Sequence, residues 1–185
     1  MDKPAPPFAV VETGFAGLRL LQPRAFEDLR GHLVKTFHAG FFKELVSSFE
    51  PREEFYSVSA KNVLRGMHFQ SPPAAHAKLA YCLGGRVLDV ALDLRRAQPT
   101  FGQCYSRELS AANREMLFMP AGFAHGFLAL EDQSLMVYKT DVIQTPDCER
   151  GVAWDSFGFP WPVVAPVMSE RDRRLPCWSD FSSPF

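Results

Sequence analysis

The feature that most constrains the fold is the frequency of chain-breaking residues. Fifteen prolines and twelve glycines interrupt the 185-residue chain at short intervals. Long helices tolerate neither residue well, whereas turns between short strands use both. The clearest strand covers residues 86–94 (RVLDVALDL), in which leucine or valine alternates with aspartate or alanine. This period of two predicts a β-strand with two different faces.

Other short apolar segments predict a mainly β protein. The further expected strands are residues 33–37, 56–59, 78–83, 116–119, 126–130 and 135–140. One short helix is expected at 41–48, and the proline- and tryptophan-rich part from residue 145 predicts loops and short helices. We therefore expect one domain over residues 1–185, a β-sandwich or barrel that holds a small ligand in its mouth and has no exposed sheet edges.

Charge and composition exclude several classes of protein. A net charge of −1 gives no global attraction to nucleic acid or to an anionic membrane surface. No apolar run reaches the ~20 residues that span a bilayer, and prolines break up the N-terminus. The four cysteines form no CxxC pair, which predicts free thiols in a reducing compartment. We therefore expect a cytoplasmic protein.

Two segments are dense in groups that can carry chemistry. In NVLRGMHFQ (62–70), His68 and Gln70 share one face of an extended chain and Arg65 takes the other, unless Gly66 bends the strand. A lone histidine of this kind is more often structural than catalytic. In FMPAGFAHGF (118–127), the glycines around His125 predict a tight backbone path that aims the imidazole inward; an exposed turn is the alternative.

Many small β-barrels hold a metal with clustered histidines and a carboxylate. This chain has His68-Phe69-Gln70 where a His-x-His pair is required, and no glutamate follows at a short spacing. The ligand set is incomplete, so we predict no metal and disfavour a metal-dependent dioxygenase.

Several motifs, in order and correctly spaced, identify a family resemblance. They are KNVLRGMHFQ (61–70), GRVLDVALDLRR (85–96), ELSAANREMLFMPAGFAHGFLALED (108–132), VYKT (137–140) and SERD (169–172). With these motifs the chain resembles the dTDP-4-dehydrorhamnose 3,5-epimerase family, from about residue 15 to the C-terminus. The resemblance implies a cupin-like jelly-roll β-barrel with a few short helices, no cofactor, and a homodimer. A separate hypothesis is that residues 4–18 cross to the barrel of the partner.

The resemblance also implies roles for individual residues. His68 is expected to be the general base, oriented by Asp172; Tyr138 the acid on the opposite face; and Lys78 the group that stabilises the enolate oxygen. A cation near Tyr138 is expected to lower the pKa of its hydroxyl. The expected substrate-binding residues are Arg65, His125, Arg30, Gln70, Lys35, Phe55 and Glu149.

Two positions depart from the family pattern. Phe55 stands where an asparagine is expected near the sugar, and an apolar ring would fit a sugar position that lacks a hydroxyl. Lys35 replaces a glutamate near the nucleobase. Because cytosine N3 accepts a hydrogen bond and thymine N3–H donates one, Lys35 could favour a CDP-sugar; a solvated or phosphate-binding lysine is the alternative.

The expected activity is epimerisation at C3 and/or C5 of a nucleotide-linked 4-keto-6-deoxyhexose, such as the conversion of dTDP-4-dehydro-6-deoxyglucose to dTDP-4-dehydrorhamnose. A mono-epimerase acting on a dTDP- or CDP-linked sugar is the first alternative. A non-catalytic barrel that binds sugar nucleotides is a more distant one. The expected partners are a nucleotide-diphosphate sugar and a second copy of the chain, with neither nucleic acid nor membrane.

Overall fold

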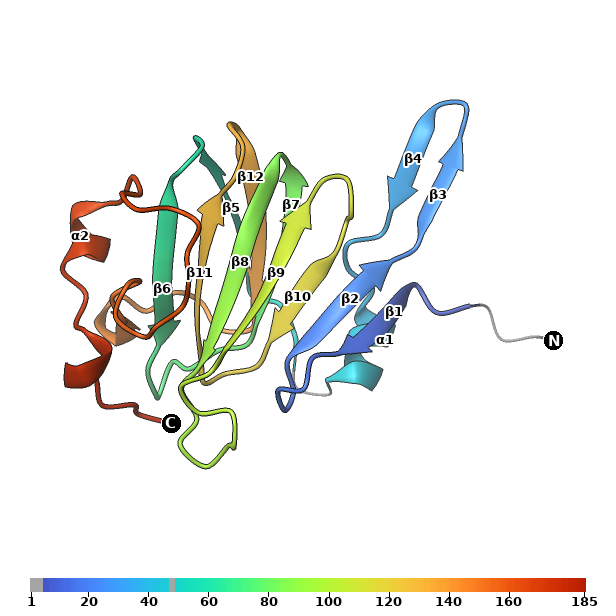
Figure 1. The fold of residues 1–185 in the computed structure, drawn as a ribbon. Helices are drawn as coiled ribbons and strands as arrows, with labels where there is room; N and C mark the ends of the chain where they lie inside the picture. Colours follow the sequence, from blue (N-terminus) through green and yellow to red (C-terminus); the bar gives the residue numbers. More distant parts are fainter. Residues whose placement is uncertain (1–4, 47–48) are drawn as a thin grey trace.

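Two β-sheets face each other in the computed structural model, which describes residues 5–46 and 49–185 (Figure 1). The six-stranded sheet runs in the order β1 (Phe8–Glu12), β2 (Arg19–Pro23), β10 (Met116–Met119), β7 (Lys78–Gly84), β12 (Ser134–Thr140) and β5 (Glu53–Ser59). The five-stranded sheet runs in the order β13 (Glu149–Gly151), β6 (Leu64–Gln70), β11 (Phe123–Ala129), β8 (Arg86–Asp93) and β9 (Cys104–Ser110). One buried apolar cluster contains residues of both sheets, so the core lies between them.

The remaining elements are short. A hairpin of β3 (Ala25–Asp28) and β4 (Gly31–Val34) extends away from the two sheets (Figure 1). The helical elements are α1 (Ala39–Leu45), η1 (Pro146–Cys148), α2 (Glu170–Arg173) and η2 (Trp178–Asp180). No helix in the described ranges is long and apolar enough to cross a membrane.

The mainly β jelly-roll architecture is confirmed, with one difference. Within the described part of the chain the two sheets are hydrogen-bonded separately and leave β1, β5, β9 and β13 as outer strands. The expected loss of all sheet edges is therefore wrong, because the sheets stay apart around the cavity described below.

Each expected strand overlaps an observed one, but the boundaries differ. The strand expected at 33–37 ends at Val34, and the helix expected at 41–48 is α1, which begins at Ala39. The Nδ1 atom of His38 accepts a hydrogen bond from the amide of Phe41 and caps this helix. Residues 47 and 48 of the expected helix, and residue 4 of the expected N-terminal extension, lie outside the described residues.

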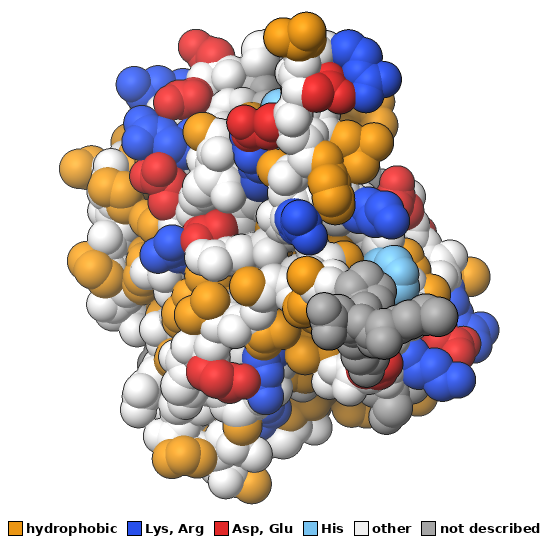
Figure 2. All heavy atoms as spheres, turned by 90° about the vertical axis from the view of Figure 1, so that its right-hand side faces the viewer, with side chains coloured by type: hydrophobic (Ala, Val, Ile, Leu, Met, Phe, Trp, Pro, Cys, Tyr) orange, Lys and Arg blue, Asp and Glu red, His pale blue; other side chains and the backbone are white. Residues whose placement is uncertain are grey.

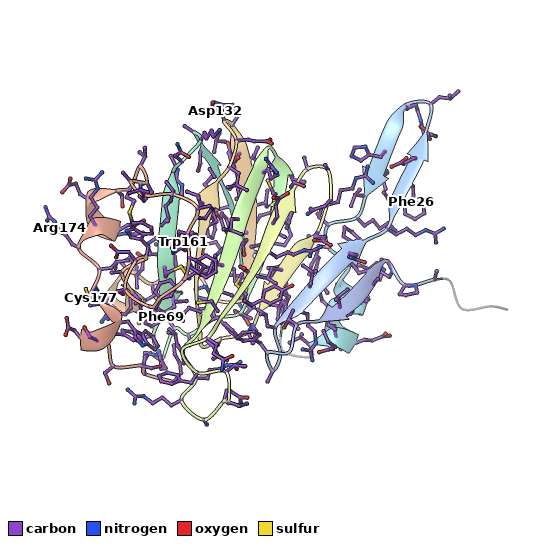
Figure 3. All side chains as sticks on the ribbon, viewed as in Figure 1. Phe26, Phe69, Asp132, Trp161, Arg174 and Cys177 are labelled. Atoms are coloured by element: carbon purple, nitrogen blue, oxygen red, sulfur yellow. The ribbon has the colours of Figure 1, made fainter. Side chains whose placement is uncertain are left out.

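The alternation in residues 86–94 produces two buried faces. Val90 and Leu92 belong to an apolar cluster that C-terminal aromatic residues cover. Phe69 of β6 and Trp161 of the C-terminal segment belong to this layer (Figure 3). The opposite face of β8 turns toward the space between the sheets and carries the fully buried Asp89. The C-terminal aromatic residues therefore cover one face of β8, and the other face, which carries Asp89, lines the space between the sheets.

Candidate functional site

A cavity of about 850 Å³ opens between the two sheets, and most of the expected site residues line it. From the expected set, it is lined by Phe55, Arg65, His68, Gln70, Lys78, His125, Tyr138, Glu149 and Asp172. Arg65 and His68 come from β6 and His125 from β11, in one sheet, whereas Lys78 comes from β7 and Tyr138 from β12, in the other. Histidine and tyrosine therefore approach the cavity from opposite sheets.

Arg65 and His68 line the same cavity because β6 contains an irregularity. His68 pairs with His125 and Arg65 with Phe127, so three steps along β6 match two steps along β11. Gly66 lies at this bulge with a φ of +134°, a conformation open mainly to glycine. The sequence left open whether Gly66 bends the strand, and the structure shows that it does.

His68 and Asp172 form a close pair. The Nε2 atom of His68 lies 2.8 Å from Oδ1 of Asp172, whose other oxygen accepts a hydrogen bond from the amide of Gly66 at 3.3 Å. Nη2 of Arg171 lies farther from the same nitrogen, at 3.2 Å, and Nε of Arg171 donates to Asp172. Because the carboxylate is the nearer partner and only accepts hydrogen bonds, we assign the proton to Nε2, which makes Nδ1 the basic atom. Burial alone would raise the pKa of Asp172, but the bonds and charge of His68 and the Gly66 amide outweigh it and lower the pKa to about 2.

The N-terminus of α2 positions Asp172. Ser169 caps this short helix, and its hydroxyl accepts a hydrogen bond from the amide of Asp172 at 3.1 Å. The segment SERD thus caps a short helix and presents one buried carboxylate to β6.

His125 is buried, as the surrounding glycines predicted. Its Nε2 lies 2.8 Å from Oδ2 of the fully buried Asp89 on the neighbouring strand. Burial lowers the pKa of His125, and the charge and hydrogen bond of Asp89 oppose this shift. The ring is therefore fixed within the cavity wall as a neutral group.

Tyr138 is almost fully buried, and its surroundings correct one expectation. Burial raises the pKa of its hydroxyl, and this effect outweighs the hydrogen bond from Ser57 and the nearby Arg65, which lower it. The expected lowering of this pKa is therefore wrong, because desolvation is the larger effect. The ring of Phe55, directly opposite on β5, stacks on Tyr138 with centroids 4.8 Å apart. The phenol is held as a neutral proton donor.

Lys78 lies at the start of β7 and supplies a cation within the cavity. Burial lowers its pKa to about 8, and Asp89 and Glu149 oppose this shift. Lys78 is therefore a cation at neutral pH but not at strongly alkaline pH.

Two expected residues lie outside the cavity of the single chain. Arg30 is at the turn of the β3–β4 hairpin, exposed and paired with Asp28, and the exposed Lys35 follows β4. Neither lines the cavity.

Three residues at the site were not identified from the sequence. Asp89 could have been found from the alternation in residues 86–94, which places it on the polar face. Arg171 belongs to the SERD motif and donates to Glu149 at 2.8 Å. His76 lies two residues before Lys78 and lines the same cavity. Within residues 5–46 and 49–185, no three His, Cys, Asp or Glu side chains are grouped to hold a metal.

Comparison with known proteins gives a consistent result. Residues 12–180 match the family model described as dTDP-4-dehydrorhamnose 3,5-epimerase. The chain is 40% identical over 166 residues to the dTDP-4-dehydrorhamnose 3,5-epimerase of Shigella flexneri, an alignment that covers 88% of this chain and 92% of the relative.

Solved structures include both kinds of epimerase. The dTDP-6-deoxy-D-glucose-3,5-epimerase of Legionella pneumophila, in complex with dTDP-4-keto-L-rhamnose, is 31% identical with a TM-score of 0.90, and the match covers 95% of each chain. A 3'-monoepimerase from Streptomyces bikiniensis in complex with dTDP-quinovose is 28% identical with a TM-score of 0.85, covering 89% of this chain and 85% of that one.

Proposed function

The chain belongs to the dTDP-4-dehydrorhamnose 3,5-epimerase family, and we propose that it inverts C3 and C5 of a dTDP-linked 4-keto-6-deoxyhexose. One observation carries this proposal. His68 of one sheet, paired with Asp172 of α2, and the buried Tyr138 of the other sheet line a single cavity of about 850 Å³. A sugar ring held between the two sheets would meet a base on one face and an acid on the other.

His68 begins the reaction. The ketone at C4 acidifies the hydrogens at C3 and C5, and Nδ1 of His68 accepts one of these protons while the electrons of the broken C–H bond form an enolate at O4. Asp172 accepts the hydrogen bond from Nε2 and stabilises the imidazolium that forms.

Lys78 and Tyr138 complete the inversion. The ammonium of Lys78 stabilises the negative charge on O4, as a preorganised donor does in an oxyanion hole. The hydroxyl of Tyr138 then gives its proton to the carbon from the opposite face, so a new C–H bond forms with inverted configuration. Exchange with solvent returns a proton to Tyr138 and removes one from His68.

The rim of the cavity supports binding of the rest of the substrate. Arg65 is an exposed cation beside the reacting groups, hydrogen-bonded to Ser59 at 3.1 Å, and suits a diphosphate. Glu149 of β13 accepts hydrogen bonds from Arg171 of α2 at 2.8 Å and from Gln144 at 3.2 Å. These bonds fix its carboxylate in the cavity wall. Gln70 orients neighbouring groups, as described below.

A mono-epimerase is the second candidate, and Phe55 is the observation that favours it. Its ring replaces a polar group and stacks directly on Tyr138, so it alters the surface against which one sugar carbon would lie. Through this contact the protein would treat C3 and C5 differently.

Proton NMR of dTDP-4-keto-6-deoxyglucose in D2O tests both candidates. Loss of the H3 and H5 signals is expected from the wild type, and neither loss is expected from His68→Asn. Loss of only one signal would replace the proposal by a mono-epimerase. Loss of neither would refute activity on this nucleotide, and the CDP-linked sugar would then test the Lys35 hypothesis.

We further propose a homodimer. β1 is an outer strand with Val10 and Val11 exposed, and the adjoining hairpin exposes Phe26 and Leu33. Figure 2 turns this side toward the viewer and shows hydrophobic side chains among charged ones. A second copy would cover this apolar surface. Light scattering should give about twice 20.8 kDa, and a monomer would contradict the proposal.

We also place the enzyme in the cytoplasm. Cys82, Cys104, Cys148 and Cys177 are all unpaired, as is usual in a reducing compartment. Fractionation of the source cells would test this location.

A further inference from the structure

His76 is a half-buried titratable residue that has no role in the mechanism above. It precedes β7 by two residues and lines the cavity with Lys78. It also lines a smaller recess of about 10 Å³ that His68, Lys78 and His125 share. His76 therefore shares a wall of the site with the groups assigned to the reaction.

A chain of hydrogen bonds fixes which nitrogen of His76 carries a proton. The amide of Thr145 donates to Oε1 of Gln70 at 2.5 Å, so the side-chain nitrogen of Gln70 must point the other way. That nitrogen lies 2.9 Å from Nδ1 of His76 and 3.3 Å from the carbonyl oxygen of Ala74. An amide nitrogen only donates, so Nδ1 of His76 accepts. The proton of the neutral ring is therefore on Nε2.

His76 is neutral at physiological pH. Burial, and then the charge of Lys78, lower its pKa to about 3, and the carbonyl of Ala74 opposes the shift. Among the described residues, Nε2 has no hydrogen-bond partner, although the ring lines the cavity. His76 is half-buried, so a substrate that fills the cavity would displace water from this N–H group and accept its hydrogen bond.

We propose that Nε2–H of His76 is a second hydrogen-bond donor, beside Lys78, for the substrate oxygen on which charge develops. The inference rests on the proposed function, in which this oxygen is O4 of the keto sugar. Lys78 supplies charge and His76 supplies a neutral, preoriented donor, so the two together form an oxyanion hole. Gln70 acts through His76 and is a positioning residue.

Two variants separate this role from packing. His76→Phe keeps a ring but has no donor, and His76→Gln keeps an N–H donor. His76→Phe should lower kcat for exchange of the sugar hydrogens about 10²–10³-fold, with KM changed much less. His76→Gln should recover a large part of that loss. Glu44→Gln, at an exposed residue of α1 that does not line the cavity, is the control and should leave the rate unchanged.

The tautomer gives an independent readout that does not require turnover. ¹⁵N NMR of the wild type, with His76→Gln used to assign its signals among the five histidines, should place the His76 proton on Nε2. A proton on Nδ1, donated to Ala74, would overturn the proposal. So would equal kcat values for the wild type and His76→Phe. Failure of the wild type to exchange any sugar hydrogen would instead refute the proposed function. The NMR measurement would still show whether Nε2 of His76 carries the proton.

Discussion

At the scale of the residue, the charge of Lys78 predicts how activity depends on pH. Burial lowers the pKa of Lys78 to about 8, so its ammonium form is present below this pH and is lost above it. Because the enolate requires a cation, kcat/KM for hydrogen exchange should fall as pH rises through about 8. Lys78→Arg should react more slowly but lose this alkaline decline, since a guanidinium stays protonated. A decline at the same pH in Lys78→Arg would contradict the assignment.

Tyr138 predicts a separation of exchange from inversion. In Tyr138→Phe the base is intact, so His68 still removes a proton and returns deuterium from the same face. Product formation should fall about 10²–10⁴-fold, the usual contribution of a general acid, while exchange into the substrate continues. NMR in D2O follows both. Ser57→Ala removes only the 3.3 Å contact to the hydroxyl and should retain inversion. If exchange and inversion fell by the same factor in Tyr138→Phe, Tyr138 would contribute to substrate binding and would not be the acid.

At the scale of the element, the bulge between β6 and β11 depends on Gly66. A Cβ atom there would lie 2.5 Å from Cα of Gly126, and the backbone has a φ of +134°. Gly66→Ala should therefore lower the free energy of unfolding by about 1–3 kcal/mol or more and reduce activity by displacing Arg65 and His68. Denaturant unfolding and exchange kinetics measure the two effects.

Gly14→Ala provides the matched control for this prediction. Gly14 has a φ of +83°, but a Cβ there would meet no atom within 4 Å. It therefore reports the cost of a positive φ without crowding. If Gly14→Ala and Gly66→Ala are equally destabilised and equally active, the packing of the bulge does not position the site.

The elements also show what the sequence could and could not predict. Local alternation was sufficient to locate β8 and its two faces, because it depends on neighbouring residues only. β6 was not assigned as a strand, since Gly66 interrupts its alternation, and β9 is mostly polar. The order of the strands is set by contacts between distant segments, such as β2 with β10, which no local pattern contains.

The sequence also predicted the residues of the site better than their protonation. Motifs of the family located His68, Lys78, Tyr138 and Asp172, which the structure brings to one cavity. The tautomer of His76 depends on Thr145, distant in the sequence, through Gln70, so it required coordinates. The direction of the pKa shift of Tyr138 also required them, because desolvation depends on how completely both sheets surround the ring.

At the scale of the whole molecule, Arg30 gives the sharpest test of assembly. It lies on a hairpin that extends away from its own cavity, exposed and paired only with Asp28 among the described residues. If Arg30 binds the nucleotide diphosphate, as the family resemblance implies, it must do so in the cavity of a second copy. Arg30→Ala should then raise KM while leaving its own His68 intact.

Mixed dimers would decide between the two arrangements. A dimer of one Arg30→Ala chain and one His68→Asn chain contains one cavity with both substitutions and one with neither, provided that Arg30 acts across the interface. Co-expression of the two chains, assayed at substrate concentrations well below KM, should therefore restore up to about half of the wild-type activity per dimer, because one of its two sites is complete. If Arg30 served its own cavity, each site of the mixed dimer would carry one substitution and the activity would not exceed that of the Arg30→Ala sites. The sizes of the homodimers and mixed dimers, measured by light scattering, show whether a lack of rescue reflects failed assembly or a site contained within one chain.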